Sequence, residues 1–214
     1  MAIILNEHFE CGCQLGIWKI TEDYNTLRSR LKLTSEELDT LERFSHLPRK
    51  IEWLSVRVLL NEMSGSDLSI YYNGNRKPFI KGNSYFISIS HSRDLTSILL
   101  SHEKRVGIDL EYMSHRIGSI SDRFINRNEQ VTEDEEQRKY HLYIHWCAKE
   151  ALYKICDKQD INFKENLTIE KFLPEEKGLL RGWVRNRMRN ELFNMHYFIL
   201  GNYVVVWTCK DANK

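Results

Sequence analysis

Three carboxylates and a lysine stand on two short segments, at spacings that suit a metal site. In residues 106–111, large apolar residues alternate with Gly107, Asp109 and Glu111, which is the period of a β-strand with one buried face. Asp109 and Glu111 therefore project from the same face, roughly 7 Å apart along the strand. At that separation the two carboxylates could share one hard cation.

The second segment has the period of an amphipathic helix. Glu150 and Lys154 lie one turn apart, at the edge of an apolar stripe. Together with the strand carboxylates they indicate a magnesium site with an acid/base pair beside it. Taken singly, each motif has a plainer interpretation, namely a solvated strand face and a surface ion pair. The apolar stripe consists of Ile144, Cys147, Ala148, Ala151, Leu152 and Ile155.

A third element favours the magnesium-site interpretation over the plainer one. Residues 85–90 alternate like another strand, and this strand runs into Ser90-His91-Ser92, whose hydroxyls and imidazole suit phosphate oxygens. Just upstream, a turn at residues 73–78 carries two cations directly before Pro78. Phosphate-binding groups therefore precede the carboxylate motifs in the chain.

Four motifs occur in an order that resembles the 4′-phosphopantetheinyl transferases. They are Lys77-Pro78, Ser90-His91-Ser92, the strand ending in Asp109 and Glu111, and the helix carrying Glu150 and Lys154. The resemblance covers roughly residues 40 to 160. The last two motifs together are specific, whereas the first two alone would carry little weight. One departure is Arg93, which stands where the family often has a glycine after Ser-His-Ser.

The resemblance implies an α+β fold of the monomeric, two-lobed subclass. Two similar lobes, related by a pseudo-twofold axis, would each pack an antiparallel sheet with a long helix. The lobes would span residues 1–104 and 105–214, with the metal carboxylates in the second and the active site in the cleft between them. Residues 52–57 weakly echo residues 145–150, with a tryptophan in register. The sequence alone leaves open whether this echo reflects a duplication or chance.

The resemblance also implies a reaction of the holo-acyl-carrier-protein synthase type. The 4′-phosphopantetheine group of coenzyme A, the substrate, would pass to a serine of an apo acyl or peptidyl carrier protein, leaving adenosine 3′,5′-bisphosphate. Asp109, Glu111 and Glu150 would bind Mg²⁺, or Mn²⁺ in its place. Glu150 and Lys154 would be the catalytic residues, the first as general base and the second as the cation that holds the pyrophosphate.

Further residues are implied in binding coenzyme A. Lys77, Ser90 and His91 match family positions that contact its phosphates, including the 3′-phosphate. Pro78, Lys154 and the helix-start cations Arg49 and Lys50 are additional candidates. Glu129 falls where the family often has a glutamate, and it could be a supporting acid near the cleft or an exposed loop carboxylate.

Two rival functions use the same residues differently. A magnesium-dependent nucleotide phosphohydrolase would use the carboxylates, but it would not need the Lys-Pro and Ser-His-Ser motifs in this order. A catalytically silent protein that binds carriers or coenzyme A would be expected to lack a metal carboxylate or the lysine. The sequence leaves open the carrier and its pathway (fatty-acid, polyketide or peptide-synthetase), the tolerance for acyl-coenzyme A and the oligomeric state.

Composition limits which partners and which cellular compartment we expect. A formal net charge of +1 gives no global attraction to nucleic acid or to a membrane surface. No apolar run approaches the length of a membrane span, and the first residues are too short for a signal h-region. We therefore expect a cytoplasmic protein that uses neither nucleic acid nor a membrane.

Periodicity and turn residues predict the order of the elements. Thr34, followed by glutamates at positions 36 and 37, is typical of a helix start, and Gly65 is typical of a helix end. The predicted strands are residues 2–6, 14–20, 68–72, 85–90, 96–100, 106–111, 179–188, 195–200 and 203–210; the predicted helices are residues 49–63, 117–126 and 139–156, with a turn at 102–105 and an acidic loop at 132–136.

Overall fold

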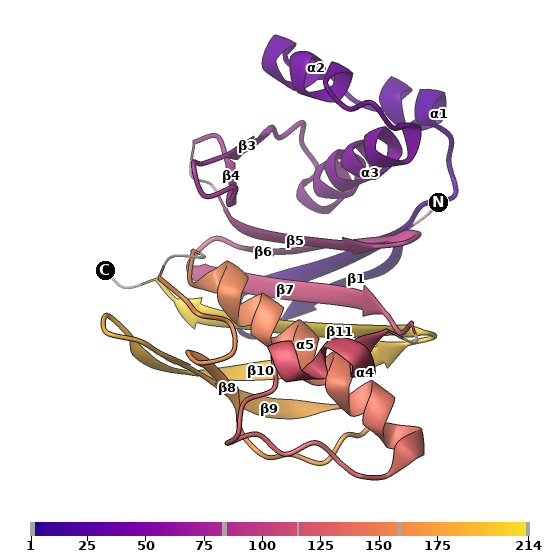
Figure 1. Ribbon diagram of the computed structural model, residues 1–214. Helices are drawn as coiled ribbons and strands as arrows, with labels where there is room; N and C mark the ends of the chain where they lie inside the picture. Colours follow the sequence, from indigo (N-terminus) through magenta and orange to yellow (C-terminus); the bar gives the residue numbers. More distant parts are fainter. Residues whose placement is uncertain (1–2, 83–84, 115, 158–159, 213–214) are drawn as a thin grey trace. The chain divides into compact units, whose positions relative to one another are not determined.

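The computed structural model describes residues 3–82, 85–114, 116–157 and 160–212, and their contacts divide the chain into two compact units (Figure 1). The first unit is Met1–Glu103 and the second is Lys104–Lys214. Each unit contains an antiparallel sheet and one long helix, so the predicted α+β class is confirmed. The pseudo-twofold relation between two lobes stays a prediction.

The first unit is built on a four-stranded sheet in the order β1-β2-β6-β5. Its long helix, α3, packs on β2 and β6, and most of its middle residues are buried. Two short helices precede α3, and a two-stranded hairpin follows it. The elements are β1 (Ile3–Phe9), β2 (Cys13–Lys19), α1 (Tyr24–Ser29), α2 (Ser35–Glu42), α3 (Leu47–Ser64), β3 (Ile70–Tyr72), β4 (Pro78–Ile80), β5 (Phe86–Ser92) and β6 (Leu95–Ser101).

Local signals explain where the helices of this unit begin and end. Thr34 and Glu37 form the predicted capping box at the start of α2. Helix α3 starts before the predicted Arg49, because Pro48 lies in its first turn, where a missing N–H costs no hydrogen bond. It ends at Gly65, whose φ of +67° is a left-handed conformation that glycine adopts without strain.

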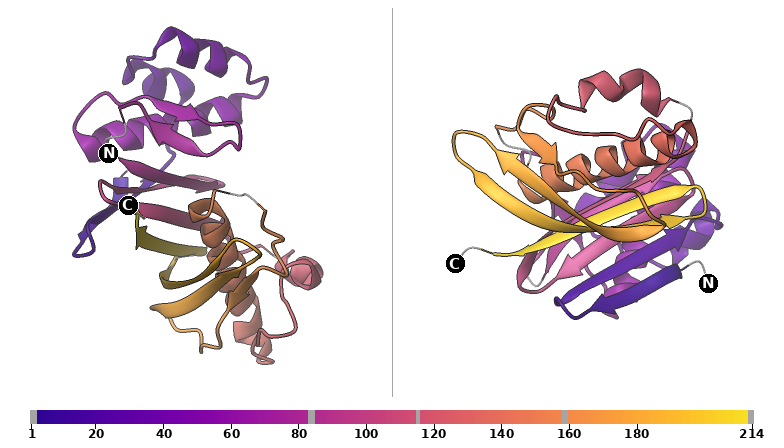
Figure 2. Two further views of the ribbon diagram at one scale, coloured as in Figure 1. Left: turned by 90° about the vertical axis from the view of Figure 1, so that its left-hand side faces the viewer. Right: turned by 90° about the horizontal axis from the view of Figure 1, so that it is seen from below.

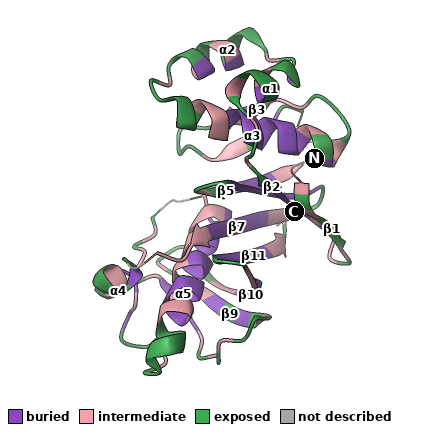
Figure 3. Cartoon of the chain, turned by 90° about the vertical axis from the view of Figure 1, so that its right-hand side faces the viewer, coloured by how far each residue is buried: buried purple, intermediate pink, exposed green. Residues whose placement is uncertain are grey.

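The second unit contains a five-stranded antiparallel sheet in the order β7-β11-β10-β9-β8, with α5 lying across one face (Figure 2). The first turns of α5 are exposed and its middle is buried against the sheet (Figure 3). The elements are β7 (Lys104–Tyr112), α4 (Ile117–Ile120), the 3-10 turn η1 (Ser121–Arg123), α5 (Glu135–Ile155), β8 (Leu167–Ile169), β9 (Lys177–Arg185), β10 (Asn190–Leu200) and β11 (Tyr203–Asp211).

Two predicted helices of this unit have different bounds in the structure. The helix predicted at 117–126 is wrong beyond Ile120. Ser119 and Ser121 donate to carbonyl oxygens three residues back, and such local bonds compete with a regular helix. The acidic loop predicted at 132–136 is wrong at its end, since α5 already begins at Glu135. Asp134 caps it by accepting from the Glu136 N–H, and acidic residues suit a first turn.

Other departures are small. Strand β7 begins at Lys104, so the predicted turn at 102–105 is shorter than expected. Helix α1 and strands β4 and β8 were not predicted, because each is too short to show a clear period. Position 2, the predicted start of the first strand, lies outside the described residues. Among the described residues, no helix combines the length and the apolarity needed to cross a membrane.

The contact between β7 and α5 depends on the absence of a side chain at Gly107. A Cβ atom added there would collide with the carbonyl oxygen of Ala151 and lie 3.0 Å from Cβ of Ile155. The strand and the helix backbone therefore approach more closely than two ordinary residues allow. This approach sets the spacing between the β7 and α5 side chains that lie on the same side.

A buried ion pair fixes α5 to the preceding loop. Lys149 Nζ lies 2.7 Å from Glu129 Oε2, and both side chains are fully buried. Lys149 also donates to the carbonyl oxygen of Phe124, and Glu129 accepts from the backbone N–H groups of Asn126 and Ile169, both at 2.8 Å. Glu129 is thus neither the exposed carboxylate nor the cleft acid considered from the sequence. It joins the loop, α5 and β8.

The surroundings of this pair shift both pKa values. Burial alone would raise the pKa of Glu129, but His145, the charge of Lys149 and the Asn126 N–H outweigh it and lower the pKa. Burial lowers the pKa of Lys149, partly opposed by Glu129. Because the pKa of Glu129 is depressed by folding, its contribution to stability is present above the pKa of an unfolded glutamate and is lost as pH falls through the folded value.

The first prediction concerns Gly107. Gly107→Ala should lower the free energy of unfolding by about 1–3 kcal/mol, because the new methyl group must push α5 away from β7. Denaturant unfolding followed by circular dichroism would measure the change. Gly118→Ala is the matched control, since nothing lies within 4 Å of a Cβ at that position. Equal stability of the Gly107 and Gly118 variants would contradict the close approach.

The second prediction concerns the buried pair. Lys149→Met should lower the free energy of unfolding by about 3–5 kcal/mol, since it leaves the Glu129 carboxylate buried without its cation. Adding Glu129→Gln should recover part of that loss, because glutamine removes the charge but keeps an oxygen for the loop N–H groups. Urea titrations of the single and double variants would test this. Additive losses would show that the two side chains are not coupled.

Candidate active site

The residues predicted to take part in chemistry fall into two groups, one in each unit. In the second unit, Asp109 and Glu111 lie on β7, while Glu150 and Lys154 lie on α5. Lys154 Nζ donates to Asp109 Oδ1 at 2.7 Å and to the carbonyl oxygen of Ile108 at 3.0 Å. The structure therefore brings Asp109 and Lys154 into direct contact.

The directions of β7 and α5 place the other two carboxylates. Gly107 faces Ala151 and Ile155 near the end of α5, whereas Asp109 and Glu111 act on the thiol of Cys147, two turns earlier. The strand and the helix thus run in opposite directions. Following β7 from Gly107 toward Glu111 leads back along α5 past Lys154 and Glu150. We call the contact between β7 and α5 the seam; Asp109 and Lys154 meet there, and Glu111 and Glu150 belong to the same two elements.

The electrostatics of this seam favour a hard cation. Asp109 is only 4% exposed, and Glu111 and Glu150 are half-buried. A buried carboxylate needs a compensating positive charge, and Lys154 supplies one for Asp109. The three carboxylates offer only oxygen donors, which is the chemistry that Mg²⁺ prefers. The residues therefore fit the implied metal.

Cys147 is the sulfur-bearing residue beside these carboxylates. Burial raises the pKa of its thiol well above the usual value, and the negative charges of Asp109 and Glu111 raise it further. A thiol must lose its proton to bind a metal. Cys147 therefore remains a neutral, small apolar residue of the α5 stripe and does not compete with the oxygen donors.

The second group of predicted residues lies in the first unit, where the start of α3 meets the end of β5. His91 Nε2 is 2.9 Å from Glu52 Oε1, and Arg49 Nη1 is 3.2 Å from His91 Nε2. Arg49 and Glu52 also form an ion pair one turn apart on α3. Arg49, which matched the family only loosely, is thus brought together with His91. Glu52 was missed in the sequence, and its spacing of three residues from Arg49 was the signal.

The remaining residues of this group lie on neighbouring strands. Lys77 immediately precedes β4, which begins at Pro78 and packs against β5. Ser90 is a buried residue of β5, and its carbonyl oxygen accepts from the Ser97 hydroxyl at 3.2 Å. The predicted coenzyme residues of the first unit therefore lie on β5, at the start of α3, or at the start of β4 and the residue before it.

Arg93, the departure from the family pattern, has a left-handed backbone. Its φ is +52°, in the turn between β5 and β6. Glycine adopts this conformation at little cost, whereas other L-residues do so less readily. The backbone of the turn therefore has the conformation that the usual glycine favours, although the side chain differs.

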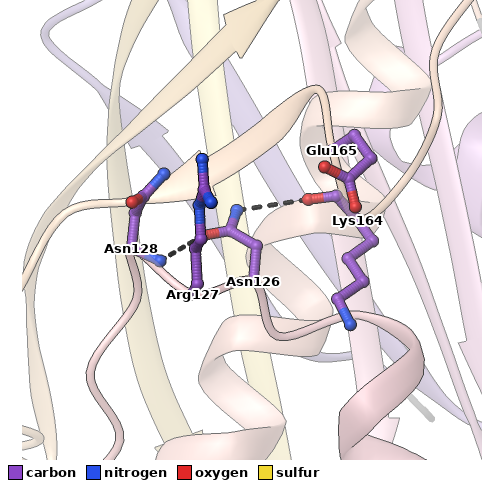
Figure 4. A pocket seen from close by; sticks show the side chains of 5 residues that line it. All are labelled: Asn126, Arg127, Asn128, Lys164 and Glu165. Atoms are coloured by element: carbon purple, nitrogen blue, oxygen red, sulfur yellow. Dashed lines mark hydrogen bonds between the residues drawn. The ribbon is translucent and has the colours of Figure 1, made fainter.

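A separate polar pocket in the second unit lies beside the loop that holds Glu129 (Figure 4). The Asn126 amide donates to the carbonyl oxygen of Lys164 at 3.2 Å, and Asn126 Oδ1 accepts from the Asn128 N–H. The first of these bonds ties the loop to the turn before β8, and the second lies within the loop. None of the predicted site residues lines this pocket, which is formed by Asn126, Arg127, Asn128, Lys164 and Glu165.

Comparison with known proteins adds an independent finding. Residues 105–208 match the family model of the 4′-phosphopantetheinyl transferase superfamily. A 4′-phosphopantetheinyl transferase AcpT of Salmonella typhi is 30% identical over 112 residues, which is 50% of this chain and 58% of that protein. The AcpT of Salmonella typhimurium is 31% identical over 112 residues, with the same coverage. The chain thus spans little more than half the length of these relatives.

The family match runs from β7 through α5 to β11. It contains Asp109, Glu111, Glu150 and Lys154, the residues on which the motif resemblance mainly rested. The structure and the comparisons therefore agree on the same part of the chain. Over residues 105–208 the chain is thus similar to the 4′-phosphopantetheinyl transferase superfamily.

Proposed function

We propose that this protein is a phosphopantetheinyl transferase that moves the 4′-phosphopantetheine group of coenzyme A to a serine of an apo carrier protein. The observation that carries the proposal is the seam of β7 and α5, where Lys154 contacts Asp109 within the segment that matches the family. The two AcpT relatives bear the name of this activity. The products would be the holo carrier and adenosine 3′,5′-bisphosphate.

Three carboxylates would hold a divalent cation, Mg²⁺ or Mn²⁺. Asp109 and Glu111 come from the strand, and Glu150 comes from the helix. When bound, such a cation neutralises negative charge on the pyrophosphate of coenzyme A. Because Asp109 is buried, its oxygens are held in place by β7 and do not have to be ordered when the substrate arrives.

Lys154 has two tasks in this scheme. Its contact with Asp109 gives that buried carboxylate a cationic partner. Its side chain is 18% exposed, so the ammonium can also attract a phosphate oxygen. The sequence suggested a mobile cation, whereas the structure shows an ammonium that is anchored at Asp109 and the Ile108 carbonyl.

Glu150 is the proposed general base. It lies one helical turn before Lys154 and is half-buried, so it can accept the proton of the attacking serine directly or through a water. In the first unit, four residues are proposed to bind the coenzyme phosphates: Arg49 of α3, Ser90 and His91 of β5, and Lys77 just before β4. The guanidinium of Arg49 suits the 3′-phosphate, because arginine forms charge-assisted hydrogen bonds to phosphate oxygens.

The third prediction separates catalysis from binding at Glu150. Glu150→Gln should lower turnover about 10²-fold or more, because it removes the base while keeping an oxygen ligand. Coenzyme A affinity should change much less. Mass spectrometry of an apo carrier incubated with enzyme, coenzyme A and Mg²⁺ would report turnover, and calorimetry would report affinity. Glu133→Gln, at an exposed position just before α5, is the matched control.

Two outcomes would contradict these assignments. Carrier modification at the wild-type rate by folded Glu150→Gln protein would exclude Glu150 as the base. Full wild-type activity in excess chelator would exclude the metal role of Asp109 and Glu111.

The fourth prediction concerns the 3′-phosphate. Arg49→Ala should weaken coenzyme A about tenfold, because a charge-assisted hydrogen bond to that phosphate is lost. Dephospho-coenzyme A, which lacks the phosphate, should bind the variant and the wild type alike. Calorimetry with both ligands measures the difference, and Arg43→Ala, at an exposed arginine after α2, is the control. Equal weakening for both ligands would place Arg49 elsewhere on the coenzyme.

A further inference from the structure

One face of β9 and β10 in the second unit points away from α5. A Cβ atom at Gly182 would meet Leu152 of α5 and Met195 of β10, so the even-numbered residues of β9 face the helix. Leu180 and Val184 accordingly belong to the core under α5. The odd-numbered residues therefore lie on the opposite face of the sheet, and Figure 2 shows α5 on only one side of these strands.

This outer face combines cations with apolar side chains. On β9 it carries Leu179, Arg181, Trp183 and Arg185, and the partners of the first three across the strand pair are His196, Asn194 and Leu192 of β10. We call these seven residues the β9 strip. Leu179 is 67% exposed, so the core does not require a leucine at this position.

Cations outnumber carboxylates along β9 and the turn after it. Residues 177–189 carry five cations and no carboxylate, namely Lys177, Arg181, Arg185, Arg187 and Arg189. The nearest counter-charge described on the strip is Glu170, whose Oε2 lies 2.6 Å from Arg181 Nη2. Arg181 is still 59% exposed, so that pair leaves its guanidinium accessible. An acidic partner would find an excess of positive charge here.

We propose that the β9 strip is a docking surface for an acidic segment of a partner protein, with carboxylates facing Arg181 and Arg185 and an apolar side chain covering Leu179. Exposed cations beside an apolar side chain offer both the polar and the apolar contacts of a protein interface. This surface is distinct from the proposed transfer site. Asp109 projects to the same side of the sheet as Gly107, toward α5, whereas the strip faces away from α5.

Trp183 decides between a protein and a single-stranded nucleic acid. Its indole N–H donates to Glu170 Oε1 at 2.7 Å, and the guanidinium of Arg185 lies 4.0 Å from its ring centroid. One face of the ring is therefore already covered by a cation. A base-stacking platform needs open aromatic faces, whereas arginine and tryptophan side chains are enriched at the positions that contribute most to protein–protein binding.

Binding of a fluorescein-labelled helical peptide, with glutamates on one face and leucines on the other, tests the proposal by fluorescence anisotropy. Leu179→Ser and the double variant Arg181→Gln/Arg185→Gln should each weaken binding about tenfold or more. The control Lys19→Gln/Arg43→Gln removes the same charge from exposed positions of the first unit and should bind like the wild type. Carrier modification should be unchanged in all these variants.

Three results would overturn the proposal. The first is equal weakening by the control pair, which would indicate attraction by net charge alone. The second is unchanged peptide binding by Leu179→Ser protein that thermal unfolding shows to be folded. The third is tighter binding of a single-stranded RNA or of phosphatidylserine vesicles than of the peptide. Peptide affinity is measured apart from transfer, so a failure of the proposed function would appear separately, as absent carrier modification.

Discussion

The close approach of β7 to α5 at Gly107 is the constraint on which the candidate site depends. A strand and a helix whose backbones are separated by ordinary side chains would hold Asp109 and Lys154 too far apart for a direct ion pair. Because Gly107 has no Cβ, the turn of α5 at Ala151 packs directly against the strand. The glycine of the metal-strand motif is therefore explained by helix packing, and the aspartate two residues later depends on it.

Buried ion pairs recur where the long helices are fixed. In the second unit, Lys149 of α5 pairs with Glu129 from the loop before it. In the first unit, Arg57 of α3 pairs with Glu37 of α2 at 2.9 Å, and its guanidinium lies over Trp53. Each pair gives a buried cation on a long helix a carboxylate partner from another segment. Such pairs contribute less to net stability than to excluding other arrangements of the helix, because desolvation offsets much of their attraction.

The sequence predicted those features whose cause is local. The capping box at Thr34, the helix end at Gly65 and the alternation of β7 all follow from a few neighbouring residues, and the structure confirms them. The contact of Asp109 with Lys154 could have been predicted, because both motifs were recognised in the sequence. The burial of Lys149 and Glu129 was not, since a lysine within a polar stretch of helix looks solvated until the tertiary contacts are known. Strand β8 was missed because three residues show no period.

The network around Glu129 also has a consequence for how the second unit loses structure. One carboxylate accepts from the loop at Asn126, from α5 at Lys149 and from β8 at Ile169. Opening any one of these segments exposes a charge that the other two were holding, so none can fray alone at low cost. The loop, the helix and the edge strand should therefore exchange their amide hydrogens as one cooperative unit, although they are far apart in the chain. A short edge strand that would otherwise be the weakest part of the sheet thereby gains the protection of its core.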